Sequence, residues 1–289
     1  MPDNQNPYKS GAPAKPVDSP TPPAKVELGK AIKATPSAPN TVTVDPGGAT
    51  FQTIGAALSS ITDNSQQKQY LLSVGPGTYN EKVTMKPYVS IQGAGQGVTI
   101  ITQPAASDAF SGGTVMAASN CTLANVSVSS LGGGWGSYST ALSCSGATQF
   151  SCDNSALLSD DQNQAGVNIS TLNASLNTFE PASQIILSYC TITANGQSNQ
   201  SVAIGVGIAE NSTAELLDSK IVATGGSQSF GVVTARSSSV TLDNCFIQGG
   251  NFALYDSDDG SLITANNCQI NGPVSNGVTV NNFPPPSND

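Results

Sequence analysis

Three features of the sequence predict an all-β chain wound as a right-handed parallel β-helix, a single-stranded solenoid with a short N-terminal capping α-helix. One short helical pattern comes first, a segment then recurs six times, and each copy carries a bend residue at the same place. A fixed motif separated by loops of variable length is typical of solenoids, in which each coil contacts only its neighbours. We therefore expect one β-helix domain over residues 41–282.

Residues 1–40 are rich in proline, lysine and small residues and show no apolar periodicity. This composition predicts a flexible or polyproline-like arm. The last residues, 283–289, have a similar composition and are expected to form a short disordered tail. Two interpretations of the arm remain open: a plain linker, or a segment that docks on a partner and mediates self-association.

The predicted domain opens with "TVTVDPGGATFQTIGAALSSI". Val42 and Val44 indicate a strand, and the following "DPGG" indicates a turn. Apolar residues then recur at helical spacing and predict a helix at about 51–62 with Thr50 as its N-cap: Phe51, Ile54, Ala57, Leu58 and Ile61. Such a helix would cover the open end of the solenoid, whose unpaired backbone groups otherwise recruit other chains.

Six segments then share one eight-residue pattern: "CTLANVSV", "FSCDNSAL", "IILSYCTI", "AELLDSKI", "VTLDNCFI" and "ITANNCQI". Apolar or small residues at the first, third, sixth and eighth places predict inward-facing side chains on two short strands. The fifth place holds residues that mostly tolerate left-handed backbone angles and so predicts a tight bend: Asn125, Asn154, Tyr189, Asp218, Asn244 and Asn267. Tyr189 is the exception, because tyrosine does not favour left-handed backbone angles. A β-sandwich would also use short strands, but it would not repeat asparagine at one place.

Six cysteines fall on predicted inward positions: Cys121, Cys144, Cys152, Cys190, Cys245 and Cys268. The last three share one column with Ser219 between them. Stacked coils would allow a Cys245–Cys268 disulfide, whereas free buried thiols that behave as small apolar residues are the favoured interpretation. With no histidine and no C-x-x-C spacing, metal binding by these thiols is not expected.

Composition narrows the function. Only 10% of residues are charged, the net charge is −9 and Arg236 is the single arginine, so a nucleic-acid partner is not expected. The absence of histidine excludes Ser–His and Cys–His nucleophile pairs. No apolar run is long enough to span a membrane, and no export signal is visible at the N-terminus. Solubility that rests on Ser, Thr, Asn, Gln and Gly is common in extracellular or cell-surface β-proteins, which is the localisation we expect.

Residues 42 to about 104 resemble the N-terminal part of pectin methylesterases, which belong to the pectate-lyase-like β-helix superfamily. The resemblance rests on "GGATFQTIGAAL", "VGPGTYNEKV" and "VSIQGAGQGVTIIT". It implies the fold of the first coils. It also implies a groove on one face of the solenoid, where two Gln, two Asp and one Arg perform ester hydrolysis. In that family one Asp is the nucleophile, the other is the acid and base, and the Gln donors stabilise the oxyanion.

The catalytic motifs are degenerate in this sequence. The stretch "SYSTALSCSGATQFSCDNSALLSDDQ" resembles the family's central block, but Tyr138 stands where the first Gln is expected. "SVAIGVG" puts Ser201 or a neighbour at the place of the second Asp. The expected Gln–Asp pair has a partial substitute, and these are the catalytic candidates: Asp160, Asp161 and Gln162.

The family's arginine segment is also replaced, because "FALYDSDDG" contains no Arg. Arg236, one coil earlier, is expected near the groove at an unmatched position. Since nucleophile and partners act as a unit, losing two or more of five removes most of the rate. We expect the scaffold without the familiar esterase activity. Asp160 and Asp161 are expected at the start of the longest loop.

Two further sets of residues are candidates. Asp256, Asp258 and Asp259, with Glu210, have the carboxylate oxygens that calcium prefers, although "DSDDGS" is also an ordinary turn composition. No cofactor is therefore expected, with calcium as the alternative. Four residues are candidates for glycan binding: Trp135, Tyr138, Tyr255 and Arg236. Flat aromatic faces suit stacking on sugar rings, and Tyr255 is expected about two coils from Tyr138. Alternatively, Trp135 packs back over its own coil.

Three functions remain after these arguments. The favoured one is a non-catalytic extracellular or surface β-helix that binds a polysaccharide or cell-surface glycan, or assembles with other chains. The second is a polysaccharide-acting esterase or lyase with a rearranged site around Asp160, Asp161 and the Asp256–Asp259 cluster. The third is a structural module of a virus-like or surface appendage, joined through the proline-rich arm.

Overall fold

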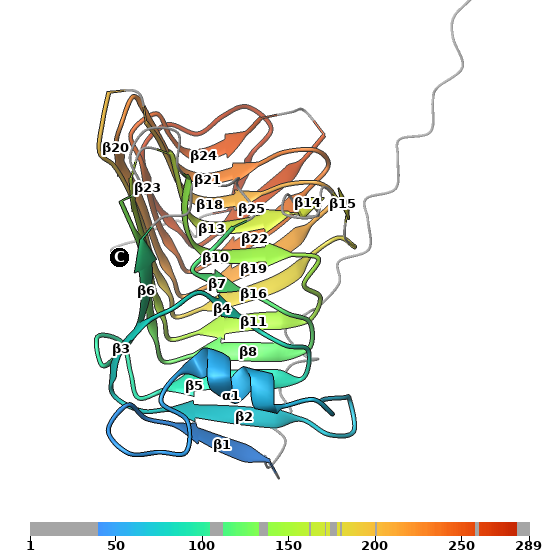
Figure 1. Cartoon of the computed structure of the whole chain (residues 1–289). Helices are drawn as coiled ribbons and strands as arrows, with labels where there is room; N and C mark the ends of the chain where they lie inside the picture. The colour runs from blue at the N-terminus through green and yellow to red at the C-terminus, as the bar shows by residue number, and fades with distance from the viewer. Residues whose placement is uncertain are drawn as a thin grey trace, which may run out of the picture. The chain divides into compact units, whose positions relative to one another are not determined.

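The computed structural model describes residues 40–104, 112–132, 138–161, 163–170, 172–173, 178–179, 181–199, 201–257 and 260–281. Over these residues the chain winds through three parallel sheets with one short helix at its N-terminal end (Figure 1). The predicted parallel β-helix is thus confirmed. The predicted arm, its role in self-association and the tail lie outside the described residues, so the domain boundaries stay predictions. No helix in the described part is long and apolar enough to cross a membrane.

Each complete coil passes once through three sheets, named here A, B and C. Sheet A contains β1 (Thr41–Val44), β2 (Tyr70–Val74), β5 (Val89–Gly93), β8 (Cys121–Ala124), β11 (Phe150–Asp153), β16 (Gln184–Ser188), β19 (Thr213–Leu217), β22 (Ser239–Asp243), β25 (Leu262–Asn266) and β27 (Thr279–Asn281), in that spatial order. Sheet B contains β3 (Gly77–Asn80), β6 (Thr99–Pro104), β9 (Ser127–Leu131), β12 (Ala156–Asp161), β17 (Thr191–Gly196), β20 (Lys220–Gly225), β23 (Phe246–Gly249) and β26 (Gln269–Asn271).

Sheet C contains β4 (Val83–Thr84), β7 (Val115–Met116), β10 (Tyr138–Ser145), β13 (Asn163–Ser170), β18 (Val202–Ile208), β21 (Gln228–Thr234) and β24 (Phe252–Asp256). A short antiparallel pair, β14 (Leu172–Asn173) and β15 (Thr178–Phe179), interrupts the coil between β13 and β16. Sequence periodicity did not predict this pair, because two residues per strand are too few to show an alternation.

Apolar columns fill the interior of the solenoid. In sheet A one column passes from coil to coil through residues that are all 0% exposed: Leu123, Cys152, Leu187, Leu216, Leu242 and Ala265. Each strand bonds to the coil before and the coil after, so inward positions repeat without slippage. Burial of these columns supplies the main stabilising term, at roughly 25 cal/mol per Å² of apolar surface.

The predicted bends connect sheet A to sheet B, and all six have positive φ: Asn125 (57°), Asn154 (42°), Tyr189 (53°), Asp218 (47°), Asn244 (57°) and Asn267 (50°). Their backbones stack, since each bend residue donates its N–H to a carbonyl of the next coil at 2.9–3.1 Å. Side-chain amides add a ladder, in which Asn154 Nδ2 donates to Asn125 Oδ1 at 2.7 Å. Tyr189 interrupts that ladder, and its side chain is 60% exposed.

Replacing Tyr189 by asparagine is expected to raise the free energy of unfolding by about 1 kcal/mol. Left-handed angles cost most L-residues roughly 1–2 kcal/mol, and asparagine lowers that cost by bonding locally. The added amide would also lie between Asn154 and Asp218. Urea denaturation measures the change, with Tyr189→Ala as the matched variant that removes the ring and keeps the strain. A Tyr189→Asn protein no more stable than Tyr189→Ala would contradict this account of the bends.

The capping helix α1 (Ile54–Ser60) is shorter than expected, and Thr53 rather than Thr50 is its N-cap. The Thr53 hydroxyl accepts the N–H of Ala56 at 3.2 Å. The prediction of Thr50 was wrong because Phe51 forms a parallel bridge with Val44, which holds this part of the chain in extended geometry before the helix can start. The helix lies against β1, β2 and β4 and covers the N-terminal end (Figure 1).

Glu81 explains the "TYNEKV" stretch of the first coil. Its carboxylate accepts the N–H groups of Ile54 and Gly55 at 2.8 Å each, so it satisfies two donors that the first turn of a helix leaves unpaired. The Tyr79 hydroxyl donates to the Gly75 carbonyl at 3.1 Å. Glu81 therefore fastens the cap to the solenoid, and Tyr79 holds the turn before its own strand.

All six cysteines are buried and free, as their inward positions predicted. Cys245 and Cys268 form no disulfide, and the Cys245 N–H donates to Cys268 Sγ at 3.4 Å. Burial raises the pKa of the Cys121 thiol to about 12 and also raises the pKa of Cys144. Because a thiol reacts as its thiolate, Cys121 and Cys144 act as packing residues in the interior.

Candidate functional site

Sheet C brings together the segments that the sequence matched to the catalytic groove. Tyr138 is the first residue of β10, Asn163 starts β13 and Val202 starts β18 directly after Ser201. The "FALYD" segment is β24, and β21 lies between β18 and β24. The chemistry that this site can perform therefore depends on the side chains on the outer face of sheet C.

The strands of sheet C carry no acid–base pair. Its seven strands contain one Asp, Glu, Lys or Arg between them, and that residue is Asp256 at the end of the last strand. Ser201, at the place of an expected carboxylate, is 0% exposed and donates its hydroxyl to the Ser198 carbonyl at 2.7 Å. Paired carboxylates with an arginine clamp cannot be assembled on these strands.

Tyr138 and Tyr255 share sheet C, but they are farther apart than the two coils expected. Three strands, β13, β18 and β21, separate β10 from β24, which corresponds to about 19 Å at about 4.8 Å per strand. The two residues also belong to different columns, since Tyr138 pairs with Asn163 and Tyr255 pairs with Val233. The spacing was misjudged because the sequence does not show which loops contain sheet C strands. The side chain of Tyr138 and all of Trp135 lie outside the described residues.

Asp160 and Asp161 do not begin a loop, contrary to expectation. Both belong to β12 of sheet B, and β13 starts at Asn163 after one intervening residue. Asp160 pairs with Leu131 and Asn195, and its carboxylate accepts a hydrogen bond from the Gln197 side chain. The strand continues because pairing on both sides outweighs the turn preference of aspartate. The side chain of Asp161 and all of Gln162 lie outside the described residues.

Asp256 is held at the end of β24. Its side chain accepts the Thr234 hydroxyl at 3.4 Å, and its backbone N–H donates to the Ser275 hydroxyl at 2.8 Å. Asp258 and Asp259 lie outside the described residues. Within the described ranges, no three His, Cys, Asp or Glu residues are grouped closely enough to hold a metal ion. Calcium binding by this segment therefore stays a prediction.

Arg236 lies at the bend after β21, with φ 54°. Its Nη1 is 2.5 Å from Oε1 of Glu210 in the preceding coil, and Glu210 is only 8% exposed. A buried carboxylate needs such a partner. The arginine charge is thus largely neutralised, and its role as a glycan ligand stays a prediction.

Three aromatic rings gather on sheet C, and sequence analysis identified only one of them. This aromatic cluster consists of Phe230 on β21 and Phe252 and Tyr255 on β24. The two phenylalanine rings are stacked with centroids 6.3 Å apart, and Tyr255 lies 5.2 Å from Phe230 and 4.8 Å from Phe252. All three side chains are half-buried. Each therefore keeps part of its surface available for contact.

A small residue in each coil directs these rings outward. It occupies the same position in β10, β13, β18, β21 and β24: Ala141, Gly166, Gly205, Gly231 and Ala253. A Cβ on Gly231 would lie 2.5 Å from the Ala253 carbonyl oxygen, so nothing larger fits there. The small residue and the residue after it are both buried, so the inward and outward alternation of side chains along the strand shifts by one position. The side chains of Phe230 and Phe252 therefore point to the outer face of sheet C. The repeated triplets "AGV", "IGV" and "FGV" were the sequence signal for this shift.

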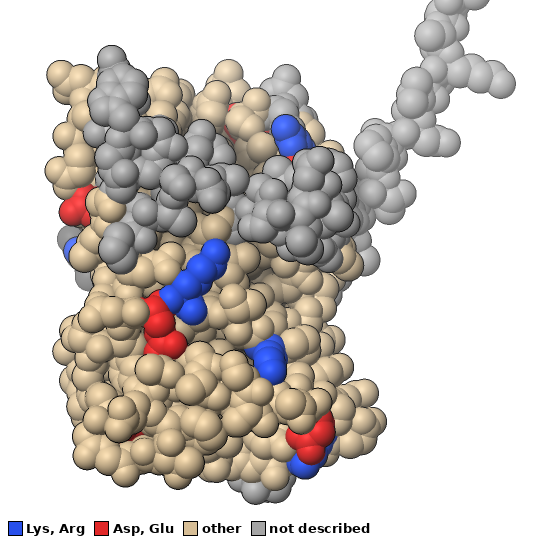
Figure 2. Space-filling model, viewed as in Figure 1, with Lys and Arg blue, Asp and Glu red and all other residues tan. Residues whose placement is uncertain are grey.

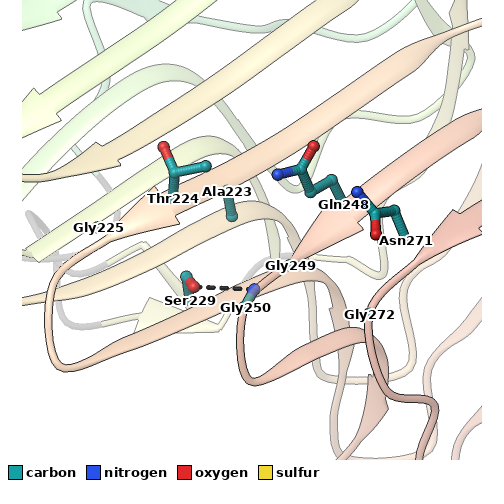
Figure 3. A pocket seen from close by; sticks show the side chains of 9 residues that line it. All are labelled: Ala223, Thr224, Gly225, Ser229, Gln248, Gly249, Gly250, Asn271 and Gly272. Carbon is teal, nitrogen blue, oxygen red and sulfur yellow. Dashed lines mark hydrogen bonds between the residues drawn. The ribbon is translucent and has the colours of Figure 1, made fainter.

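A pocket of about 310 Å³ lies beside the aromatic cluster, where sheet B turns into sheet C (Figure 3). It is lined by Ala223, Thr224, Gly225, Ser229, Gln248, Gly249, Gly250, Asn271 and Gly272. Ser229 Oγ accepts the Gly250 N–H at 2.9 Å and fixes one wall. Glycine lets neighbouring backbones approach closely here, because a Cβ on Gly249 would lie 2.0 Å from the Phe252 carbonyl oxygen. No lining residue is charged.

Stacked coils, three parallel sheets and an N-terminal helical cap define a right-handed parallel β-helix protein, and its fold is that of the pectin methylesterases. Pectin methylesterase from carrot superimposes with a TM-score of 0.57 at 14% identity, covering 88% of this chain and 91% of that chain. The enzyme from Aspergillus niger, in a partly deglycosylated form, gives a TM-score of 0.53 at 17% identity and covers 88% of each chain.

The sequence comparison agrees over a shorter span. A probable pectinesterase of Arabidopsis thaliana, number 50 in its series, is 33% identical over 82 residues. That alignment covers 27% of this chain and 22% of the relative's length. No family model matches the chain. The protein is therefore pectinesterase-like in its scaffold.

Proposed function

We propose that this chain is a non-catalytic, extracellular or cell-surface β-helix that binds a glycan on the outer face of sheet C. The observation that carries the proposal is the replacement of carboxylates by the aromatic cluster on this face. A pectinesterase-like scaffold supports a polysaccharide as the partner, since the solved neighbours from carrot and Aspergillus niger are named as pectin methylesterases. The low content of charged residues supports the extracellular setting.

The chemistry of the face supports binding without turnover. Aromatic rings stack on the apolar faces of sugars, and the Tyr255 hydroxyl adds a polar group. Asn168 and Gly207 belong to the same register column as Val233 and Tyr255. A Cβ on Gly207 would lie 3.6 Å from its nearest neighbour, which is ordinary van der Waals contact, so glycine keeps this position of the column low. A sugar chain has room to lie along this column.

Replacing Tyr255 by alanine is expected to weaken glycan binding by about tenfold, which corresponds to about 1.4 kcal/mol. Affinity electrophoresis through gels that contain pectin, galactan or xylan would identify a ligand, and titration calorimetry would give its Kd. Tyr189→Ala is the matched control, because Tyr189 is an exposed tyrosine on a sheet A to sheet B bend. Equal loss in both variants, or no loss in Tyr255→Ala, would count against sheet C as the binding face.

A polysaccharide-acting enzyme is the second candidate, and the pectin methylesterases among the structural neighbours favour it. Its residues would be Asp160 and Asp161 on β12 or the segment that starts at Asp256. These belong to different sheets, and release of methanol or of unsaturated sugars would support this candidate. The third candidate, assembly through the proline-rich arm, depends on residues outside those the structure describes.

A further inference from the structure

We infer that the ligand is an uncharged polysaccharide, and that the pocket beside the aromatic cluster is a second subsite for it. This inference rests on the proposed function and narrows it. It is carried by the charges around sheet C, by the lining of the pocket and by the continuity between pocket and cluster.

The charges around the cluster oppose an acidic ligand. Asp256 directly follows Tyr255, and the strands of sheet C contain no lysine or arginine. Arg236 is paired with Glu210, so these two charges offset each other. Two more aspartates come after Ser257 in the sequence. Acidic polysaccharides are bound by Arg and Lys through charge-assisted hydrogen bonds, whereas the strands of sheet C offer one carboxylate, Asp256, and no cation.

The pocket has the polar groups that sugar hydroxyls need. Gln248 on β23 and Asn271 on β26 pair in register, and Figure 3 shows their side chains next to each other on one side of the pocket. An amide both donates and accepts, as a hydroxyl does. Neither amide has a hydrogen-bond partner among the residues that the structure describes, whereas Thr224 Oγ1 donates to Asn195 Oδ1 at 3.1 Å. The two amides are thus available to a ligand.

The pocket and the aromatic cluster lie on adjoining sides of one corner. Ser229 lines the pocket, and Phe230, the next residue, belongs to the cluster. On the neighbouring coil Gly250 lines the pocket, and Phe252 follows two residues later. A polymer that stacks on the cluster can therefore place a neighbouring sugar in the pocket. Figure 2 shows one face of the molecule, on which the described Lys, Arg, Asp and Glu residues are few.

Lys220 is the one cation on the outer face of the pocket's own strands. Its Nζ lies 5.7 Å from the centroid of the Phe246 ring, on the neighbouring strand. It belongs to another register column than Gln248. This cation–π contact holds the Lys220 ammonium against the Phe246 ring, but the ammonium would still attract an acidic ligand. Lys220→Gln is therefore included in the test.

The experiment compares neutral galactan, arabinan and xylan with polygalacturonate at low ionic strength, using the full chain and calorimetry. A neutral polymer is expected to bind at least tenfold more tightly than polygalacturonate. Because salt screens repulsion between exposed charges, added salt is expected to narrow this ratio. Gln248→Ala with Asn271→Ala is expected to weaken neutral binding threefold to tenfold. Gln269→Ala, an exposed amide on β26 outside the pocket, is the matched control and is expected to change nothing.

Four outcomes decide the matter, provided that every variant melts like the parent protein. Tighter binding of polygalacturonate, especially if Lys220→Gln abolishes it, would overturn the uncharged ligand and leave glycan binding in place. An unchanged Kd in the double amide variant, with a weaker one in Tyr255→Ala, would overturn the second subsite alone. No binding to any glycan would overturn the proposed function itself. Neutral binding that depends on both Tyr255 and the amides would support the whole inference.

Discussion

Replacing Phe150 by alanine is expected to lower the free energy of unfolding by about 3–5 kcal/mol, the usual cost of removing a buried phenylalanine. Phe150 is 0% exposed and is among the largest fully buried side chains in the described part of the chain. It stands between Cys121 and Ile185 of the adjoining coils. Because β11 is hydrogen-bonded to a strand on each side, the coils cannot move into the cavity that the substitution leaves. Relaxation of the structure therefore recovers little of the lost stability.

Urea denaturation measures this loss, and Phe246→Ala is the matched control. Phe246 is half-buried on the outer face of sheet B, where its removal leaves a surface notch rather than a cavity. We expect a change of at most about 1 kcal/mol there. A loss below about 1 kcal/mol at Phe150, or equal losses at both positions, would contradict the stacked inward columns.

Pure protein incubated with methylated pectin is expected to release methanol at the background rate, at least about 10³-fold below an active esterase. The reason lies in sheet C, where Asp256 is the only Asp, Glu, Lys or Arg on the strands. A nucleophile, an acid–base partner and an arginine clamp are all required at once. The buried thiol of Cys121 cannot replace the nucleophile, because burial raises its pKa to about 12.

The control for this assay is Asp160→Asn. The substitution removes one of the two carboxylates on β12 and keeps an acceptor for the Gln197 side chain. Since we assign no chemistry to Asp160, the parent and the variant should give the same background signal. Turnover in the parent that disappears in Asp160→Asn would show a rearranged site on sheet B and refute the non-catalytic interpretation.

Local backbone preferences made the winding of the chain predictable from sequence. The six bends were identified from residues that tolerate positive φ, and even the misfit Tyr189 adopts 53° there. Inward positions were predictable because each bend resets the alternation in the same way. The burial of the six cysteines was predicted by the same alternation. Each of these features depends on a residue and its near neighbours along the chain.

The errors concern features that depend on contacts between coils. Thr50 has the chemistry of an N-cap, but the bridge between Phe51 and Val44 moves the helix start to Thr53. Asp160 and Asp161 have turn chemistry, but pairing with flanking strands keeps them in β12. Glu210, Arg236 and Gln149 also adopt positive φ, at bends that the sequence pattern did not mark.

The candidate site was only partly predictable for the same reason. Tyr255 was identified from its chemistry, whereas Phe230 and Phe252 were not singled out. Their outward direction depends on the small residue that follows each of them, and this effect becomes visible only when the coils are aligned on sheet C. The pocket depends on glycines from successive coils that meet at one corner.

A crystal structure of the protein soaked with a neutral oligosaccharide tests the central claim most directly. We predict an intact sugar chain in van der Waals contact, at about 4 Å, with the rings of Phe230, Phe252 or Tyr255. A sugar bound instead beside Asp160 on sheet B, or found there as a cleaved product, would contradict the account.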